Sequence, residues 1–446
     1  MRRRDFMLST AGLGLSASLA SCSRIASANE DKAPQPRAIP EKIGGRTLQE
    51  LRDELRHYLF DIHLPFWDRG GDDTQYGGYM CILANDGKPL SDEKYIWFQG
   101  RGIWTLSYAY NRFGKNPKHL ESARRARDFM VKHMYAGDGR WVSCVRRDGS
   151  PVKGVSGSIY DWTFPAEGLI EFYKAAGNKE DLDLAIASIR AAAAAYDTPD
   201  YKGSRSDPPG SRIQGHSMVF VHTLRQLLEI KKEPWSESMQ REHVDAVMNR
   251  FYDPETHISN ENLDHDYRRI EELRDYMMLG HSLETRWMVM FETLRTGDRK
   301  LFDDCAEAIK RWIPMGWDYN FEGWGGGAYY VNDTGTHGHG AVFNTKTMWS
   351  QAETMIACAT VLEYTGAEWA AEYYGRAMDF IRRVFAHEDR PWSLVARRKG
   401  ELVEGSAGGD GNRKDNYHPP RAMMLCMESL DRMIKNDRRL TPFPRG

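Results

Sequence analysis

Apolar residues recur at spacings of three and four along most of the chain, which is the pattern of helices that bury one face. The first such segment, 47–62, opens with a capping box made by Thr47 and Glu50. Glycines end several later segments, for example at Gly177 and Gly366. The same period predicts helices at 98–113, 116–135, 161–176, 181–196, 216–230, 281–296, 299–313, 346–365, 368–385 and 418–435. The glycines that end helices recur at intervals of roughly 60 residues or twice that, and this repeat predicts about six helix pairs.

A sharper repeat lies within this helical pattern. The set Lys94, Trp97, Gln99 and Arg101 matches the set Lys346, Trp349, Gln351 and Glu353 at a constant offset of 252 residues. Short β-type stretches with turn signals lie between the helices at 79–83, 141–145, 328–331 and 392–396, and they predict hairpin loops on one rim. The expected fold is therefore all-α, a closed toroid of helix pairs with these loops over a central funnel.

The first residues have the features of an export signal. Arg3 and Arg4 begin a twin-arginine motif, a weakly apolar stretch follows, and Cys22 closes a sequence, LASC, that resembles a bacterial lipobox. We therefore expect a signal peptide at 1–21, a flexible tether at 22–45 and a catalytic barrel at 46–446. Export by the twin-arginine route would give a periplasmic or outer-membrane-anchored lipoprotein, lipidated at Cys22. A plain signal peptide with a chance cysteine is the alternative.

Composition narrows the classes of partner. The chain carries 61 basic and 63 acidic residues without a dominant run of like charge, which argues against a nucleic-acid partner. Loss of residues 1–21 would change the net charge from −2 to −4. Five widely spaced cysteines then remain, without a Cys-x-x-Cys pair, so neither a disulfide framework nor a zinc site is expected. Membrane contact is expected only through the N-terminal lipid.

Five segments carry a family resemblance. They read KYIWFQGRGIW, SIYDWTFPAEGLIEFYKAAG, MMLGHSLETRW, KTMWSQAETM and NYHPPRAMML. Over about residues 46–436 the chain resembles the N-acylglucosamine 2-epimerase family, which includes cellobiose 2-epimerases and aldose-ketose isomerases. The resemblance implies an (α/α)6 barrel and an isomerase that epimerises or isomerises a small reducing sugar. No cofactor is expected, because histidine, arginine and glutamate side chains can move the proton by themselves.

Two pairs of polar residues carry the chemistry that the resemblance implies. His281 and Glu284 are three positions apart on one predicted helix, and His418 and Arg421 repeat that spacing on the last one. Imidazole serves as base and acid near neutral pH, as removal and return of a proton beside a carbonyl require. The resemblance implies that His281 and His418 form this catalytic pair, with Glu284 orienting His281.

A fixed cation and several aromatic residues complete the predicted site. Arg101 would stabilise the negative charge of the enediolate, and an ion pair with its repeat partner Glu353 is the alternative. For the tryptophans, core packing is at least as well supported as sugar stacking. The sugar-binding candidates are Lys94, Trp97, Tyr160, Lys346, Trp349, Glu353 and Arg421, and Asp161 and Phe164 begin the same inner helix as Tyr160.

Departures from the family pattern leave the substrate open. Cellobiose 2-epimerases carry a third histidine in a Met-His pair, whereas here Met218 is followed by Val219, and His222 lies a turn later. The glycine-rich stretch 405–411 contains no phosphate-binding GKS or GKT sequence, so a nucleotide-independent enzyme is expected. Epimerisation, aldose-ketose isomerisation and a homodimer all remain open.

Three rival functions need different residues. A glycoside hydrolase or lyase on the same barrel would need paired carboxylates, for which Asp161, Glu284, Glu353 and Asp266 are candidates, but it leaves both histidine motifs unexplained. A metal enzyme could use His337 and His339, yet no further ligands follow at a recognised spacing, so no metal is expected. A non-catalytic sugar-binding lipoprotein is the non-enzyme alternative.

Overall fold

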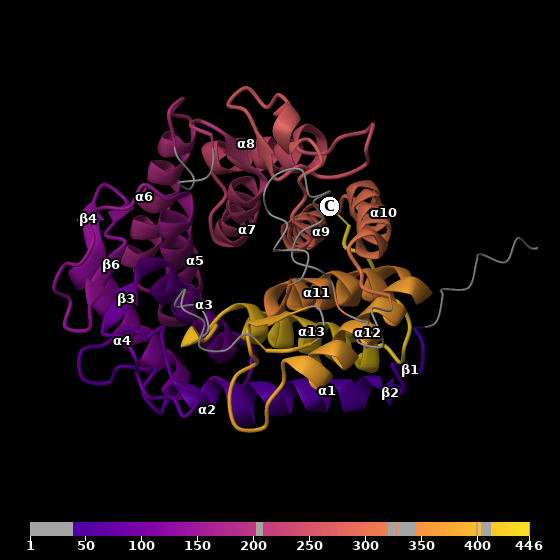
Figure 1. The fold of residues 1–446 in the computed structure, drawn as a ribbon, viewed down its shortest axis with the longest axis horizontal. Coiled ribbons are helices and arrows are strands. Elements are labelled where there is room, and N and C mark those ends of the chain that lie inside the picture. Colours follow the sequence, from indigo (N-terminus) through magenta and orange to yellow (C-terminus); the bar gives the residue numbers. More distant parts are fainter. Residues whose placement is uncertain are drawn as a thin grey trace, which may run out of the picture. The chain divides into compact units, whose positions relative to one another are not determined.

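The computed structural model describes residues 39–201, 208–319, 327, 345–397, 400–402 and 412–445. Within them, two concentric sets of helices form a ring (Figure 1). The inner set consists of α3 (Ile96–Arg112), α5 (Ile159–Ala176), α7 (Gln214–Ile230), α9 (Leu279–Thr296), α11 (Met348–Thr365) and α13 (His418–Lys435). Successive inner helices pack side by side, and α13 returns to contact α3. The predicted (α/α)6 barrel is confirmed.

The outer set covers the inner one. It consists of α4 (Pro117–Met134), α6 (Lys179–Tyr196), α8 (Pro234–Asp245), α10 (Arg299–Met315), α12 (Glu368–Val384) and α1 (Leu48–His57), which continues through the π-helix η1 (Tyr58–His63) into α2 (Leu64–Trp67). A second π-helix, η2 (Ala246–Arg250), extends α8, and the short 3-10 helix η3 (Glu271–Leu273) precedes α9. None of the described helices is long and apolar enough to cross a membrane.

Burial explains which helices the sequence pattern reveals. Outer helices such as α10 bury one apolar stripe, whereas inner helices such as α11 are buried on nearly every side. The predicted helices all form, but α8 is missing from the prediction. Its fully buried positions are Ser236, Gln240 and His243, whereas its apolar residues Trp235, Met239 and Val244 are only partly buried, so the apolar stripe that would reveal the helix is weak.

A close contact between α3 and α5 requires glycine on both helices. A Cβ atom on Gly100 would lie 2.4 Å from the carbonyl oxygen of Phe164, and one on Gly168 would lie 2.4 Å from the carbonyl oxygen of Gly100. Only glycine allows the two backbones to approach this closely. The contact fixes the position of Arg101, which follows Gly100 on α3.

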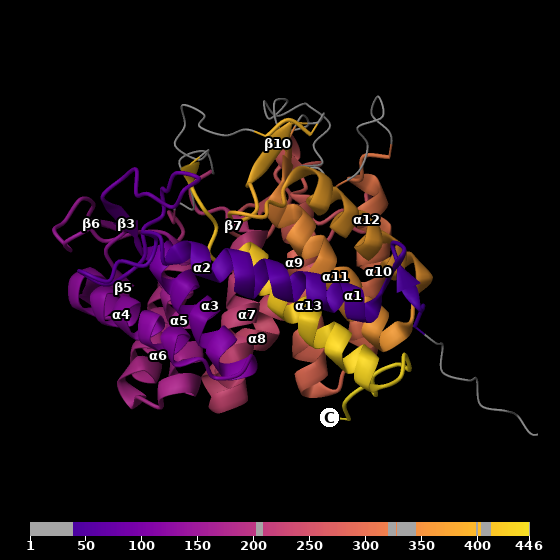
Figure 2. The same ribbon diagram turned by 90° about the horizontal axis from the view of Figure 1, so that it is seen from below.

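Short strands gather at one end of the ring (Figure 2). The pairs are β3 (Glu93–Tyr95) with β6 (Cys144–Arg146), β7 (Arg212–Ile213) with β8 (Asn262–Leu263), and β9 (Thr345–Thr347) with β10 (Val395–Arg397). Away from them β4 (Tyr135–Gly137) pairs with β5 (Arg140–Trp141), and β1 (Lys42–Ile43) with β2 (Arg46–Thr47). Bridges such as Leu83 to Pro89 close the predicted hairpin turns, while the predicted stretch 328–331 lies outside the described residues. The strands β3, β7 and β9 lead directly into inner helices.

The barrel domain includes residues that the sequence assigns to the tether. Ile39 and Ile43 are buried in the core, and the backbone N–H of Ile39 donates to the carbonyl oxygen of Arg438 at 2.8 Å. Residues 39–45, predicted as part of the tether, therefore belong to the barrel. The predicted signal peptide and Cys22 lie outside the described residues.

Candidate active site

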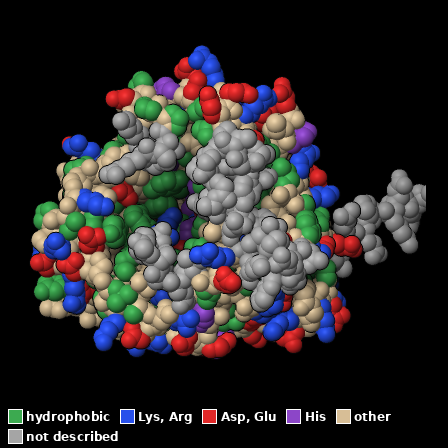
Figure 3. All heavy atoms as spheres, viewed as in Figure 1, with side chains coloured by type: hydrophobic (Ala, Val, Ile, Leu, Met, Phe, Trp, Pro, Cys, Tyr) green, Lys and Arg blue, Asp and Glu red, His purple; other side chains and the backbone are tan. Residues whose placement is uncertain are grey.

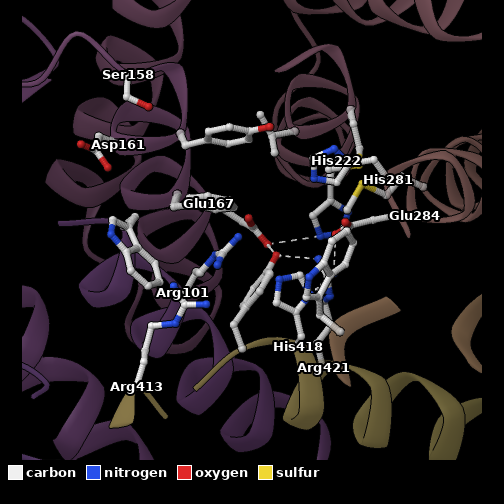
Figure 4. Close-up of a pocket in the computed structure, with 18 residues that line it drawn as sticks. Arg101, Ser158, Asp161, Glu167, His222, His281, Glu284, Arg413, His418 and Arg421 are labelled. Atoms are coloured by element: carbon white, nitrogen blue, oxygen red, sulfur yellow. Dashed lines mark hydrogen bonds and ion pairs between the residues drawn. The ribbon is translucent and has the colours of Figure 1, made fainter. Parts of the chain in front are cut away.

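A cavity of about 350 Å³ opens into the barrel. Figure 3 looks onto the end of the ring that carries the strands and shows the surface hollowed there. Most lining residues come from the first three turns of the inner helices, and the others come from the segments that precede these helices (Figure 4). They are Trp97, Arg101, Ser158, Tyr160, Asp161, Phe164, Glu167, Met218, Val219, His222, His281, Glu284, Met288, Trp349, Arg413, Tyr417, His418 and Arg421. The ring thus brings together residues more than 300 positions apart in sequence.

His281 lies in the first turn of α9 and faces this cavity. Its Nδ1 is 2.8 Å from Oε1 of Glu261, a buried residue just before β8. Burial lowers the pKa of His281, but the negative charges of Glu261, Glu284 and Glu353 raise it by more, so its pKa lies above the ordinary value. The predicted partner, Glu284, does not orient this ring, because its carboxylate binds an arginine instead.

His418 is the first residue of α13 and is held by two carboxylates. Oδ1 of Asp415 accepts the backbone N–H groups of Tyr417 and His418, at 2.8 and 3.0 Å. Nδ1 of the His418 ring lies 2.9 Å from Oε1 of Glu353. Each catalytic candidate therefore has one ring nitrogen next to a carboxylate, which fixes the ring and leaves the other nitrogen for substrate.

Arg421 links the acidic residues around His418. Its Nη2 donates to Oε1 of Glu353 at 2.7 Å and to Glu284, and its Nη1 donates to the Tyr417 hydroxyl at 2.9 Å. Burial raises the pKa of Glu353, but the neighbouring Arg421 and His418 outweigh it and lower this pKa to about 2. The predicted sugar contacts Glu353 and Arg421 thus form a buried ion pair beside the cavity.

The same cluster has the spacing of a metal site. Ligand atoms of Glu284, Glu353 and His418 lie within 4.8 Å of one another. However, the carboxylate oxygens that converge here already accept hydrogen bonds from the Arg421 guanidinium. That cation supplies the positive charge that a metal would bring, so the residues present do not favour a metal ion. His337 and His339, the other metal candidates, lie outside the described residues, as do residues 403–411.

Arg101 enters the cavity between aromatic rings. Its guanidinium carbon lies 3.9 Å from the ring centre of Phe164, 4.9 Å from that of Tyr417 and 5.4 Å from that of Trp97. Burial lowers the pKa of Arg101. The alternative ion pair with Glu353 does not form, since among the described residues Arg421 is the arginine that binds it. Arg101 is thus a fixed cation available to an oxygen of the substrate.

The aromatic candidates also line the cavity. The Trp349 ring centre lies 5.3 Å from that of His281 and 5.6 Å from that of His418, so its indole borders both histidines. Trp97 and Tyr160 lie on other parts of the wall. These three rings give the cavity apolar faces against which a sugar ring can stack.

Lys94 and Lys346 do not reach the cavity. The Lys94 ammonium is fully buried and lies 2.8 Å from Oδ2 of Asp73, and that of Lys346 lies 2.7 Å from Oδ2 of Asp318. Both bridge a loop to the strand that starts an inner helix, β3 or β9. Their predicted role in sugar binding is wrong, because each charge is used within the barrel wall. The repeated lysines position the helices that carry Trp97 and Trp349.

Several functional candidates escape prediction from the sequence. Glu261 and Glu167 lie near their histidines only in the folded ring, and no local spacing relates them to their partners. Asp415 stands three residues before His418, and this local spacing could have indicated its contact with the start of the helix. Asp161 lines the cavity, and its Oδ2 accepts the hydroxyls of Ser143 and Ser156. Asp266 is exposed and pairs with Arg268 away from the cavity.

Comparisons with known proteins agree on one family. Residues 77–422 match the sequence profile of N-acylglucosamine 2-epimerase. The N-acylglucosamine 2-epimerase of Mus musculus is 26% identical over 89% of this chain and 95% of its own length. The cellobiose 2-epimerase of Bacteroides fragilis is 23% identical over 85% of this chain and 98% of its own length. The structure of the cellobiose 2-epimerase from Spirochaeta thermophila superimposes with a TM-score of 0.73 at 20% identity, covering 87% of this chain and 98% of that one.

Proposed function

The chain belongs to the N-acylglucosamine 2-epimerase family, and from this membership we propose an isomerase that moves a proton at the carbon beside the carbonyl of a reducing sugar. The observation that carries the proposal is the pair His281 and His418. They come from different inner helices, each is backed by a carboxylate, and both border one aromatic-lined cavity (Figure 4).

The geometry supports a two-histidine proton transfer. One imidazole, neutral, removes the proton from C2 of the open-chain aldose, and the C–H electron pair forms the C1–C2 double bond of an enediolate. Arg101 stabilises the charge that develops on the former carbonyl oxygen. The other histidine, protonated, returns a proton. Return to the opposite face of C2 gives the epimer. Return to C1, with the proton of the O2 hydroxyl passing to O1 as the C2 carbonyl forms, gives the ketose.

A hydrolase is less well supported by the same residues. Hydrolysis by two carboxyl groups needs one of them protonated as the general acid. Glu353 remains ionised because its pKa lies at about 2, and Glu284 binds Arg421. Hydrolysis would also leave both carboxylate-backed histidines without a role. The alternative of a silent binding protein is not favoured, since both histidines and Arg101 face the cavity together.

The test is a panel of reducing sugars incubated with the purified protein in deuterated water. Proton NMR then follows the loss of the C2 signal and the growth of new sugars. We expect deuterium at C2 together with an epimer or ketose for at least one sugar, without added metal or nucleotide. Hydrolysis of a glycoside without exchange at C2 would contradict the proposal, as would activity that depends on ATP.

We also propose that the enzyme is exported and anchored by lipid at Cys22. The twin-arginine motif and the LASC sequence support this proposal. An exported enzyme would act on reducing sugars released from extracellular polysaccharide. The variant Cys22→Ala is expected to be released from the membrane fraction as a soluble exported product, and unchanged membrane association would contradict lipidation.

A further inference from the structure

The cavity of this enzyme ends on a layer of the barrel that contains one acid and one histidine. The ninth residues of α3, α5, α7 and α9 are Trp104, Glu167, His222 and Trp287. They lie about 12 Å along their helices from the starting rim, some 9 Å below the level of His281. The His222 ring centre is 6.5 Å from that of Trp104 and 5.5 Å from that of Trp287, which confirms that the four form one layer.

Glu167 and His222 contact each other within this layer. Nε2 of His222 lies 3.2 Å from Oε1 of Glu167, which also accepts the Tyr417 hydroxyl at 2.6 Å. Burial raises the pKa of Glu167, but His222 and the Tyr417 hydroxyl outweigh it and the net pKa is lowered. Burial lowers the pKa of His222 more than Glu167 raises it, so the ring is neutral near pH 7. Neither ring nitrogen makes another hydrogen bond among the described residues, so the 3.2 Å approach of Nε2 to an ionised Glu167 favours the single ring proton on Nε2.

This arrangement leaves Nδ1 of His222 as a hydrogen-bond acceptor without a partner. Among the described residues no donor reaches this atom, although the side chain is only 2% exposed and lines the cavity. Buried polar atoms of native proteins are nearly always hydrogen-bonded. A neutral acceptor at the end of a sugar-sized cavity fits an O–H group of the bound molecule.

We propose that His222, held by Glu167, binds a hydroxyl group at the end of the sugar remote from the reacting carbons. The inference rests on the proposed function, because it takes the ligand to be a sugar that reacts between His281 and His418. It deepens that function by assigning a residue that selects substrates. Sugars that lack this hydroxyl would leave Nδ1 unpaired, so their kcat/KM should be lower by roughly tenfold to a hundredfold.

The test compares the sugar identified by the panel with its 3-, 4-, 5- and 6-deoxy analogues. In the wild-type enzyme we expect one analogue to show kcat/KM lower by roughly tenfold to a hundredfold. The variant His222→Phe keeps a ring but has no acceptor. Its kcat/KM for the parent sugar should fall to its kcat/KM for that analogue, so the ratio of the two values approaches one. Persistence of the ratio in His222→Phe, or the absence of any discriminated analogue in the wild type, would overturn the inference.

A matched control separates this role from general burial. His243 is also a buried imidazole, with its Nδ1 at 3.3 Å from the Ser217 hydroxyl, and it does not line the cavity. His243→Phe should leave the deoxy-sugar ratio unchanged. His222→Gln, which restores an acceptor, should recover part of the ratio and serves where His222→Phe does not fold.

Failure of the proposed function would be visible separately. If no sugar exchanges at C2 with the wild-type protein, titration calorimetry finds the panel sugar that binds most tightly, and its deoxy analogues are compared with it by their dissociation constants. A ratio of dissociation constants that collapses in His222→Phe would support the hydroxyl contact even then. Equal affinities of wild-type protein for every analogue would overturn it.

Discussion

At the scale of single residues, each histidine of the site has a carboxylate next to one of its ring nitrogens. Glu261 serves His281, Glu353 serves His418 and Glu167 serves His222. Each carboxylate fixes the orientation of a ring and sets which nitrogen faces the cavity. Only Glu353 among these three belongs to the predicted site, because it stands in the repeated Lys-x-x-Trp-x-Gln pattern. Glu261 and Glu167 contact histidines 20 and 55 positions away, so no local pattern marks them.

Replacement of Glu261 by glutamine should change the pH dependence of the enzyme. The Glu261 charge raises the pKa of His281, and the acid limb of kcat/KM reports the protonation of such a base in the free enzyme. Glu261→Gln removes that charge, so the acid limb should move to lower pH. The plateau should fall by on the order of 10²- to 10⁴-fold, since the ring loses its fixed tautomer.

The matched control is Glu255→Gln. Glu255 lies in the same connection between α8 and α9, but it is exposed and pairs with Arg274. This variant should keep the wild-type profile. An acid limb that stays in place in Glu261→Gln would show that His281 does not supply the limiting proton transfer.

At the scale of elements, the repeated strand-to-helix connections hold the catalytic helices in place. Lys94→Met should destabilise the protein, because the fully buried ammonium donates to Asp73 and to the carbonyl oxygens of Gly77 and Arg147. Loss of one partner of a buried ion pair costs about 3 kcal/mol of unfolding free energy, the low end applying here because Arg147 still pairs with Asp73. Denaturant unfolding measures this loss.

The kinetics of the same variant distinguish structure from sugar binding. Lys94→Met should keep the KM of the folded enzyme within the wild-type range, whereas a lysine that contacts sugar would raise it. The exposed Lys179 on α6, which pairs with Asp183, offers a control. Lys179→Met should change neither the unfolding free energy nor KM.

The N-terminal hairpin gives a second prediction at this scale. A protein that starts at Ile39 should melt like the longer chain, whereas one that starts at Arg46 should melt at a lower temperature. The shorter form loses the buried side chains of Ile39 and Ile43, which together contribute about 3 kcal/mol or more. Equal melting temperatures of the two forms would show that residues 39–45 add nothing to the fold.

The elements show why sequence reasoning succeeds for most of the fold. Helices with an apolar stripe or a glycine stop, such as α10 and α5, are visible in the periodicity. The fully buried positions of α8 are polar, so the periodicity does not reveal this helix. The strands β6 and β10 pair with β3 and β9, which lie far from them in sequence, so local patterns do not reveal these pairings. The candidate histidines are recoverable because each stands in a distinctive motif, whereas Glu261 and Asp415 stand in connecting segments.

At the scale of the whole molecule, closure of the ring creates the active site. Arg421 of the last helix binds Glu284, 137 positions earlier, and the Tyr417 hydroxyl binds Glu167, 250 positions earlier. These contacts depend on α13 returning beside α3, so no spacing in the sequence predicts them. Lys94 and Lys346 illustrate the converse, since their clear repeat reflects the symmetry of the wall and not contact with substrate.

The central claim is that His281 and His418 transfer protons on one sugar carbon. The most direct measurement is the rate of solvent deuterium incorporation at C2, with the sugar found by the panel, in wild-type protein and in the folded variants His281→Ala and His418→Ala. We predict that the wild type forms a product labelled at C2. Each variant should lose formation of that product by on the order of 10²- to 10⁴-fold, because a methyl group cannot exchange a proton. A folded variant that forms labelled product at the wild-type rate would contradict the account.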